Sequence, residues 1–193
     1  MIVETTNLQD VLIIKPTVFK DKRGYFYESF NYNKLNDHIG HFDIVQINQS
    51  KSKSNVLRGL HFQKPPCNQA KIIEVITGVI IDVVVDIRTD SPTFGQHQTF
   101  VLDNFDKSQL YIPRGFAHGF VVLSRYAIFQ YKVDNEYAPN FDTGIRFDDK
   151  ELNIDWEVQN PIISDKDKNL KTFSEQEFYR KSEYLYNPIA LSY

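Results

Sequence analysis

Short runs of apolar and aromatic residues alternate with turn-forming residues along most of this chain, a pattern typical of β-strands joined by turns. The run Val79–Ile87 is so rich in β-branched residues that it is predicted to be a buried strand. Because Thr77-Gly78 separates this run from Lys71–Val75, we expect those two strands to form a hairpin. Further strands are predicted at Val11–Ile14, Gly24–Phe30, Phe100–Leu102, Gln109–Ile112, Gly119–Leu123 and Ala127–Val133. Many short strands at this spacing predict an all-β sandwich or barrel.

Helix signals are scarce along the chain. One short helix is predicted at Tyr32–Ile39, and a second at Glu175–Tyr184, because Ser174 and Glu177 match a capping box. The sequence shows no internal repeat or linker, and 193 residues suit one domain with a substantial core. We therefore predict a single domain over residues 1–193, with a polar tail from about residue 169 that packs loosely on the barrel or on a partner.

Composition and charge exclude several classes of protein. A net charge of −3 gives no reason to expect a nucleic-acid surface. No apolar stretch approaches the ~18 residues that span a bilayer, and the N-terminus lacks the pattern of a signal peptide. The one cysteine, Cys67, excludes an internal disulfide and is ordinary for a reducing compartment. We therefore expect a cytoplasmic protein that binds neither nucleic acid nor membranes.

Two segments carry the candidate chemistry. In VLRGLHFQKPPCNQAK, from Val56 to Lys71, His61 lies among an arginine, a glutamine and two lysines. In IPRGFAHGF, a Pro-Gly turn leads into a predicted strand with His118 at the junction. Two histidines with cationic neighbours predict acid–base chemistry. The other three histidines, His38, His41 and His97, are in polar or turn-like surroundings and are predicted to be surface residues.

A metal site is not expected, although the histidine motif invites one. The spacing Pro113-x-Gly115-x-x-His118 resembles the second motif of the cupins, which are jelly-roll barrels. Cupins usually supply His-x-His and a downstream Glu as metal ligands. Here Gln63 follows His61, and Lys71 stands in the expected Glu position. Because an ammonium group repels a divalent cation, we expect neither a metal nor another cofactor.

Seven motifs in order resemble those of the dTDP-4-dehydrorhamnose 3,5-epimerase family. They are FKDKRGYFYESF, QINQSKS, NVLRGLHFQKPP, DIRTDSPTFG, IPRGFAHGF, QYKVDNEYAP and ISDKD, and they extend from about Phe19 to Asp167. The resemblance implies a cupin-like jelly-roll β-barrel with a few short helices. It also implies a homodimeric enzyme that inverts C3, C5 or both in a nucleotide-linked 4-keto-6-deoxyhexose, in rhamnose-type deoxysugar biosynthesis.

The same resemblance assigns catalytic roles to four residues. Hydrogens on C3 and C5 are acidic because each carbon adjoins the C4 carbonyl, so inversion needs a base, an acid and a cation near the enolate oxygen. The resemblance makes His61 the base, Tyr131 the acid and Asp167 the carboxylate that orients the histidine. Lys71 is suited to stabilising the enolate. Lys71 favours neutral His61 and Asp167 favours the protonated form, and the sequence leaves that balance open.

Substrate-binding residues follow from the resemblance in the same way. Arginine and lysine are expected on the diphosphate or sugar, amides and a carboxylate on base or sugar edges, and aromatic rings beside them. The expected set is Arg23, Phe26, Glu28, Gln46, Asn48, Arg58, His118, Tyr137, Asp142 and Lys166. Asp142 departs from the family pattern, where a Glu is usual, and its side chain is one methylene group shorter than the side chain expected to contact the substrate.

Three other interpretations stay open at this point. An epimerase that inverts only C3 or only C5 would use the same base and acid. A non-catalytic sugar-nucleotide-binding barrel is disfavoured by the presence of His61, Tyr131 and Lys71. A metal-dependent cupin oxygenase or isomerase is disfavoured by the missing ligand set.

Overall fold

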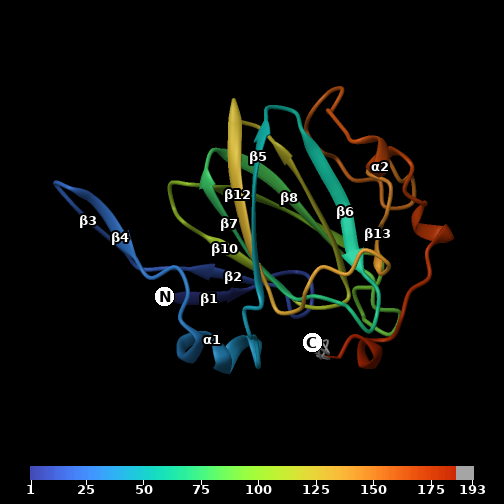
Figure 1. Cartoon of the computed structure of the whole chain (residues 1–193), viewed down its shortest axis with the longest axis horizontal. Coiled ribbons are helices and arrows are strands. Elements are labelled where there is room, and N and C mark those ends of the chain that lie inside the picture. Colours follow the sequence, from blue (N-terminus) through green and yellow to red (C-terminus); the bar gives the residue numbers. More distant parts are fainter. Residues whose placement is uncertain (186–193) are drawn as a thin grey trace.

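The computed structural model describes residues 1–185, in which most strands belong to two antiparallel β-sheets packed face to face (Figure 1). The strands are β1 Ile2–Thr5, β2 Leu12–Lys15, β3 Val18–Asp21, β4 Gly24–Tyr27, β5 Gln46–Lys53, β6 Leu57–Gln63, β7 Lys71–Thr77, β8 Val79–Asp86, β9 His97–Asp103, β10 Gln109–Ile112, β11 Phe116–Val122, β12 Tyr126–Val133 and β13 Asp142–Gly144. The helices are α1 Tyr32–Ile39 and α2 Asp165–Lys168, with 3-10 turns at Phe173–Glu175 and Lys181–Glu183. The predicted all-β jelly-roll class with a few short helices is confirmed.

The larger sheet has the strand order β1-β2-β10-β7-β12-β5, and the smaller sheet has the order β13-β6-β11-β8-β9. Apolar side chains from both sheets meet between them, among them Ile73 of β7, Val84 of β8, Phe120 of β11 and Phe129 of β12. Alternate residues of each strand point into this space, so the strand pattern of the sequence produces the core directly.

The outer face of each sheet is also covered. Leu35 of α1 and Phe42 pack on Ile72 and Tyr111 of the larger sheet. The segment after β13 crosses the smaller sheet, where Phe173 and Tyr184 are buried (Figure 1, orange and red). The predicted tail beyond residue 169 therefore packs on the barrel as far as residue 185, and its last part, residues 186–193, lies outside the described residues.

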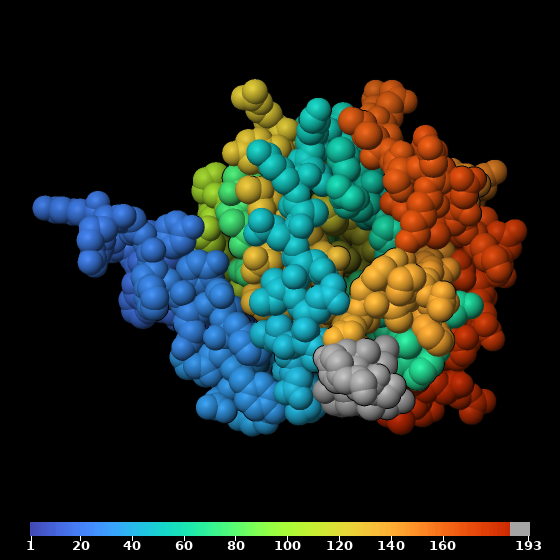
Figure 2. All heavy atoms as spheres, viewed as in Figure 1, coloured from blue at the N-terminus to red at the C-terminus, as the bar shows by residue number. Residues whose placement is uncertain are grey.

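The two-stranded hairpin of β3 and β4 extends away from the body of the molecule (Figures 1 and 2, blue). Phe19 and Phe26 on this arm are 62% and 69% exposed. No helix of the described chain is long and apolar enough to cross a membrane.

Two local predictions were wrong. Strands β7 and β8 do not form a hairpin: β7 pairs with β10 and β12, and β8 pairs with β9 and β11. The turn at Gly78 instead carries the chain from one sheet to the other. The predicted helix over Glu175–Tyr184 is absent, and 3-10 turns lie at either end of that range. A capping box does occur nearby, but it joins Thr172 to Glu175.

Strands β5 and β6 were not predicted, although they carry much of the site. Strand β6 approaches β11 unusually closely at Gly59, where a Cβ atom would lie 2.5 Å from the Cα atom of Gly119. Gly59 also has a φ of 122°, which side chains rarely adopt. This close contact lies between Arg58 and His61, so it sets the position of both on the sheet.

We predict that Gly59→Ala lowers the free energy of unfolding by about 1–3 kcal/mol more than Gly24→Ala does. Both residues have positive φ, but a Cβ atom on Gly24 would have no neighbour within 4 Å among the described residues. The control variant therefore contains the backbone strain without the clash. Chemical denaturation of both variants checks the difference, and equal destabilisation would contradict the importance of the close approach.

Candidate active site

A cavity of about 400 Å³ opens at one end of the space between the sheets. It receives side chains from both sheets, from the loop after β12 and from α2. The cavity brings together most of the residues predicted for the site, namely His61, Tyr131, Lys71, Gln46, Asn48, Arg58, His118, Tyr137, Asp142 and Lys166. Residues separated by more than 100 positions along the chain thus surround one small volume.

His61 is the histidine predicted to act as a base, and its ring is held by a buried carboxylate. Its Nε2 atom lies 2.8 Å from Oδ1 of Asp167, which is 3% exposed. The other oxygen of Asp167 accepts a hydrogen bond from the backbone N–H of Gly59. Ser164 caps α2 by accepting from the N–H of Asp167, so the short helix fixes the carboxylate behind the ring. Side chains from β6 and α2 therefore form one histidine–carboxylate pair.

Asp167 is held in its ionised form by these contacts. Burial alone would raise the pKa of its carboxyl group, but the hydrogen bond and charge of His61, with the hydrogen bonds of Gly59 and Ser164, lower that pKa below 3.8. A carboxylate in this position orients the imidazole and stabilises the cation that forms when His61 takes a proton.

Tyr131 projects into the cavity from β12, in the sheet opposite His61. Burial and the nearby charge of Asp142 raise the pKa of its phenol, and Arg58 and a hydrogen bond with Asn48 oppose the rise only in part. The phenol consequently stays protonated at neutral pH and can donate a proton.

Lys71 and His118 bring two nitrogen-bearing side chains to the cavity. Burial lowers the pKa of the Lys71 ammonium, and the charges of Asp142 and Asp82 oppose that shift. Nε2 of His118 lies 2.7 Å from Oδ2 of Asp82, a residue with no exposed surface. Burial raises the pKa of Asp82, and its interactions with His118 and Lys71 oppose that shift. A second histidine–carboxylate pair is therefore present, in which His118 lines the cavity and Asp82 is buried beside it.

Asp82 was missed in the sequence, although a signal for it exists. It interrupts the apolar run VIIDVVVD of β8, and an acidic residue in a buried strand needs a partner. That partner is His118, on the neighbouring strand β11. The predicted surface position of His97 was also only partly right, since this residue is half-buried.

Tyr137, Asp142 and Lys166 lie together at the cavity. The Tyr137 hydroxyl donates to Oδ2 of Asp142 at 3.2 Å, and the Lys166 ammonium forms an ion pair with the same oxygen. Asp142 thus already has two partners within the chain. On the other side, Arg58 donates from Nε to Oγ of Ser52 at 3.1 Å.

Three predicted binding residues lie outside this cavity. Arg23, Phe26 and Glu28 are on the arm or directly after it, and none of them lines the cavity. Arg23 forms an ion pair with Asp21, and Glu28 forms one with Lys34. Within one chain the structure does not bring these three residues to the other site residues.

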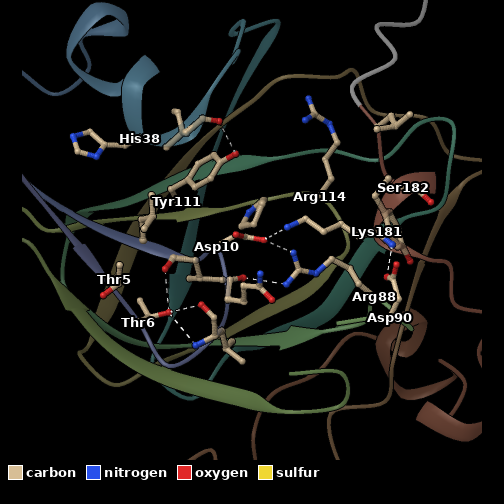
Figure 3. A pocket seen from close by; sticks show the side chains of 18 residues that line it. Thr5, Thr6, Asp10, His38, Arg88, Asp90, Tyr111, Arg114, Lys181 and Ser182 are labelled. Atoms are coloured by element: carbon tan, nitrogen blue, oxygen red, sulfur yellow. Dashed lines mark hydrogen bonds and ion pairs between the residues drawn. The ribbon is translucent and has the colours of Figure 1, made fainter. Parts of the chain in front are cut away.

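A second and larger cavity, of about 960 Å³, lies between the β1–β2 turn, the end of α1 and the segment Lys181–Leu185 (Figure 3). Its central charges are paired with one another, since Asp10 accepts from Arg88 and from Lys181. None of the predicted catalytic residues lines it. The candidate chemistry is therefore in the smaller cavity.

The residues of the smaller cavity suit proton transfer better than metal binding. Among residues 1–185, no group of three or more His, Cys, Asp or Glu side chains is placed to hold a metal ion. Lys71 and Gln63 occupy the positions where a cupin metal centre would have ligands, and both line the cavity. The fold and the site together define an acid–base enzyme built on a cupin-like jelly-roll barrel.

Comparison with known proteins agrees with that class. The family model for dTDP-4-dehydrorhamnose 3,5-epimerase matches residues 5–175. An enzyme of that name from Shigella flexneri is 47% identical over 90% of this chain and 97% of its own length. The chain belongs to the dTDP-4-dehydrorhamnose 3,5-epimerase family, as its seven motifs predicted.

Solved structures of the family superpose closely on this one. The enzyme from Elizabethkingia anophelis is 46% identical, with a TM-score of 0.87 over 92% of this chain and 99% of its own. An epimerase from Legionella pneumophila, crystallised with dTDP-4-keto-L-rhamnose, is 39% identical, with a TM-score of 0.88 over 92% of this chain and 97% of its own.

The state of Asp167 gives a prediction about stability and pH. Because its pKa is lower in the folded protein than the ordinary 3.8, the unfolded chain binds more protons in acid, and the stabilisation is lost as the pH falls through the folded pKa. We predict that Asp167→Asn lowers the free energy of unfolding by about 1–3 kcal/mol at pH 7, and that this difference from wild type shrinks below pH 3.8.

Asp165→Asn is the matched control, because Asp165 is in the same helix with a side chain that is 94% exposed. Denaturant unfolding of all three proteins at several pH values measures the effect. A difference for Asp167→Asn that stays constant into acid would show that the carboxylate charge does not stabilise the fold.

Proposed function

We propose that this protein inverts C3 and C5 of a dTDP-linked 4-keto-6-deoxyhexose through enolate intermediates. The observation that carries the proposal is the placement of His61 and Tyr131 on opposite sheets, both lining one cavity. A sugar ring between them would have a base on one face and an acid on the other, which is what inversion at carbon requires.

The proposed reaction uses residues already described. His61 removes the proton from the carbon beside the carbonyl, and the negative charge moves to the C4 oxygen. Lys71 supplies the positive charge that stabilises this enolate, and His118 lines the same cavity. Tyr131 then delivers a proton to the opposite face of the same carbon. Asp167 holds His61 in place, and Asp82 holds His118.

The binding residues divide between the nucleotide and the sugar. Arg58 is exposed beside the cavity and offers a planar donor fork to the diphosphate. Tyr137, which is 51% exposed, offers a ring to the base, and Lys166 lies beside it. Gln46 and Asn48 provide amides along β5 for base or sugar edges. The resulting cavity would serve a reaction of deoxysugar biosynthesis in the cytoplasm.

A homodimer would explain the three residues outside the cavity. The arm carries Arg23 and Phe26 away from its own barrel, and it exposes Phe19, Tyr25 and Phe26 by 57% or more. Exposed aromatic residues on a projecting hairpin are typical of a surface that another chain covers. We therefore propose that the arm, with Glu28 at its base, completes the substrate site of a partner subunit.

The direct test is incubation of the purified protein with dTDP-4-keto-6-deoxyglucose in deuterated water, with a chelator present, followed by NMR. The proposal predicts inverted product with deuterium at C3 and at C5. Deuterium at only one carbon would identify a single-site epimerase. A protein that binds the substrate without exchange would be a binding barrel, and activity that depends on an added divalent ion would contradict the acid–base scheme.

We predict that His61→Asn lowers the rate of deuterium exchange at both carbons by ~10²–10⁴-fold. Asparagine keeps a polar side chain near Asp167 but cannot accept the substrate proton. His38→Asn is the control, since His38 is exposed and lies outside this cavity. Undiminished exchange in a folded His61→Asn protein would remove His61 from the mechanism.

A further inference from the structure

Gln63 is a buried glutamine whose side chain is fully engaged. It is 5% exposed and lies on β6, two residues after His61. Its Nε2 atom donates to the carbonyl of Cys67 at 2.6 Å and to the carbonyl of Glu136 at 3.1 Å. Its Oε1 atom accepts from the N–H of Ala138 at 2.7 Å. The side-chain amide of Gln63 therefore uses its nitrogen and its oxygen in hydrogen bonds to main-chain groups.

Two of those groups flank Tyr137. Gln63 donates to the carbonyl of Glu136, which precedes Tyr137, and accepts from the N–H of Ala138, which follows Tyr137. Gln46 accepts from the N–H of Tyr137 itself at 3.0 Å. Gln69 adds a bond from its Nε2 atom to the carbonyl of Asn135 at 2.7 Å. Side-chain amides thus form hydrogen bonds with the main chain of four consecutive residues, from Asn135 to Ala138, in the loop after β12.

The ring of Tyr137 depends on this support for its position. The ring lines the cavity but is 51% exposed, and its hydroxyl is fixed by Asp142 at 3.2 Å. A half-exposed ring has less packing to define its position than a buried one, so the main chain that carries it must be held instead. Gln63 provides that restraint from the strand that also carries the base.

We propose that Gln63 is a positioning residue that fixes Tyr137 at the cavity and thereby sets the affinity for the nucleotide part of the substrate. The proposal rests on the proposed function, in which Tyr137 contacts the nucleotide. Gln63 acts through the loop rather than on the reacting carbons, so it governs binding and not proton transfer.

The test is a double-mutant cycle read by calorimetric titration with dTDP. Gln63→Met keeps the length of the side chain and its neutrality but removes the donors and the acceptor. We expect Gln63→Met to weaken dTDP binding ~10-fold, and Tyr137→Ala to weaken it by a comparable factor. In the Tyr137→Ala background, Gln63→Met should change the affinity less than about twofold, because the ring that it positions is gone. Turnover at saturating substrate should stay within about twofold of wild type in Gln63→Met.

Gln98→Met is the matched control, because Gln98 on β9 also accepts from a backbone N–H, that of Asn7, away from the cavity. It should leave dTDP affinity unchanged. If the two substitutions act independently, the double variant should bind dTDP about 100-fold more weakly than wild type, and that result would overturn the proposal. So would a fall in turnover with unchanged affinity.

Two further results distinguish a purely structural role of Gln63 from a failure of the proposed epimerase function. If Gln63→Met does not fold, the double-mutant cycle is repeated with Gln63→Glu. Loss of the folded state in both variants would overturn the proposal, because Gln63 would then be a structural residue. Failure of the wild-type protein to epimerise the sugar while it still binds dTDP would contradict the proposed function alone.

Discussion

The division of the barrel interior into an apolar end and an ionisable end is the constraint on which the site depends. Along β7 the inward positions run from Lys71 to Ile73 and Val75, and along β12 they run from Tyr131 to Phe129. The apolar part stabilises the contact between the sheets, and the same contact removes water from the groups at the other end. Burial therefore lowers the pKa of Lys71 and raises the pKa of Tyr131 together. One packing arrangement thus keeps the Tyr131 phenol protonated and leaves Lys71 poorly solvated, as the proposed roles of these two residues require.

The apolar strands could be predicted from the sequence, among them β7 and β12, which carry Lys71 and Tyr131, but β5 and β6 could not. Val79–Ile87 was recognisable because its β-branched run is buried on both faces. In β5 the inward residues are Gln46, Asn48 and Ser50, because they line the cavity and not the core. A strand whose inward face is polar loses the alternation that identifies it. The prediction of a hairpin around Gly78 was wrong for another reason. In the sequence, a short turn between two apolar runs has the same pattern whether the two strands pair or enter different sheets.

The candidate site was recovered mainly through motifs, because its residues are scattered along the chain. His61 and Asp167 are 106 positions apart, and no periodicity relates them. Asp82 was overlooked since its role appears only when β8 and β11 pair and place it beside His118. The reverse is true of Arg23, Phe26 and Glu28. Their motif was recognisable in the sequence, but the fold of one chain does not bring them to the cavity. Motifs indicate candidate residues, and only the packing shows which of these lie together within one subunit.

The proposed mechanism requires a base and an acid that face each other across the sugar. Its most direct test is Tyr131→Phe incubated with dTDP-4-keto-6-deoxyglucose in deuterated water and followed by NMR. The ring and its packing on Phe129 are kept, so only the hydroxyl is lost. We expect that in this variant His61 still forms the enolate and returns deuterium to the same face, giving labelled substrate with little inverted product. Normal inversion in this variant would show that another group or water delivers the proton, and would contradict the account.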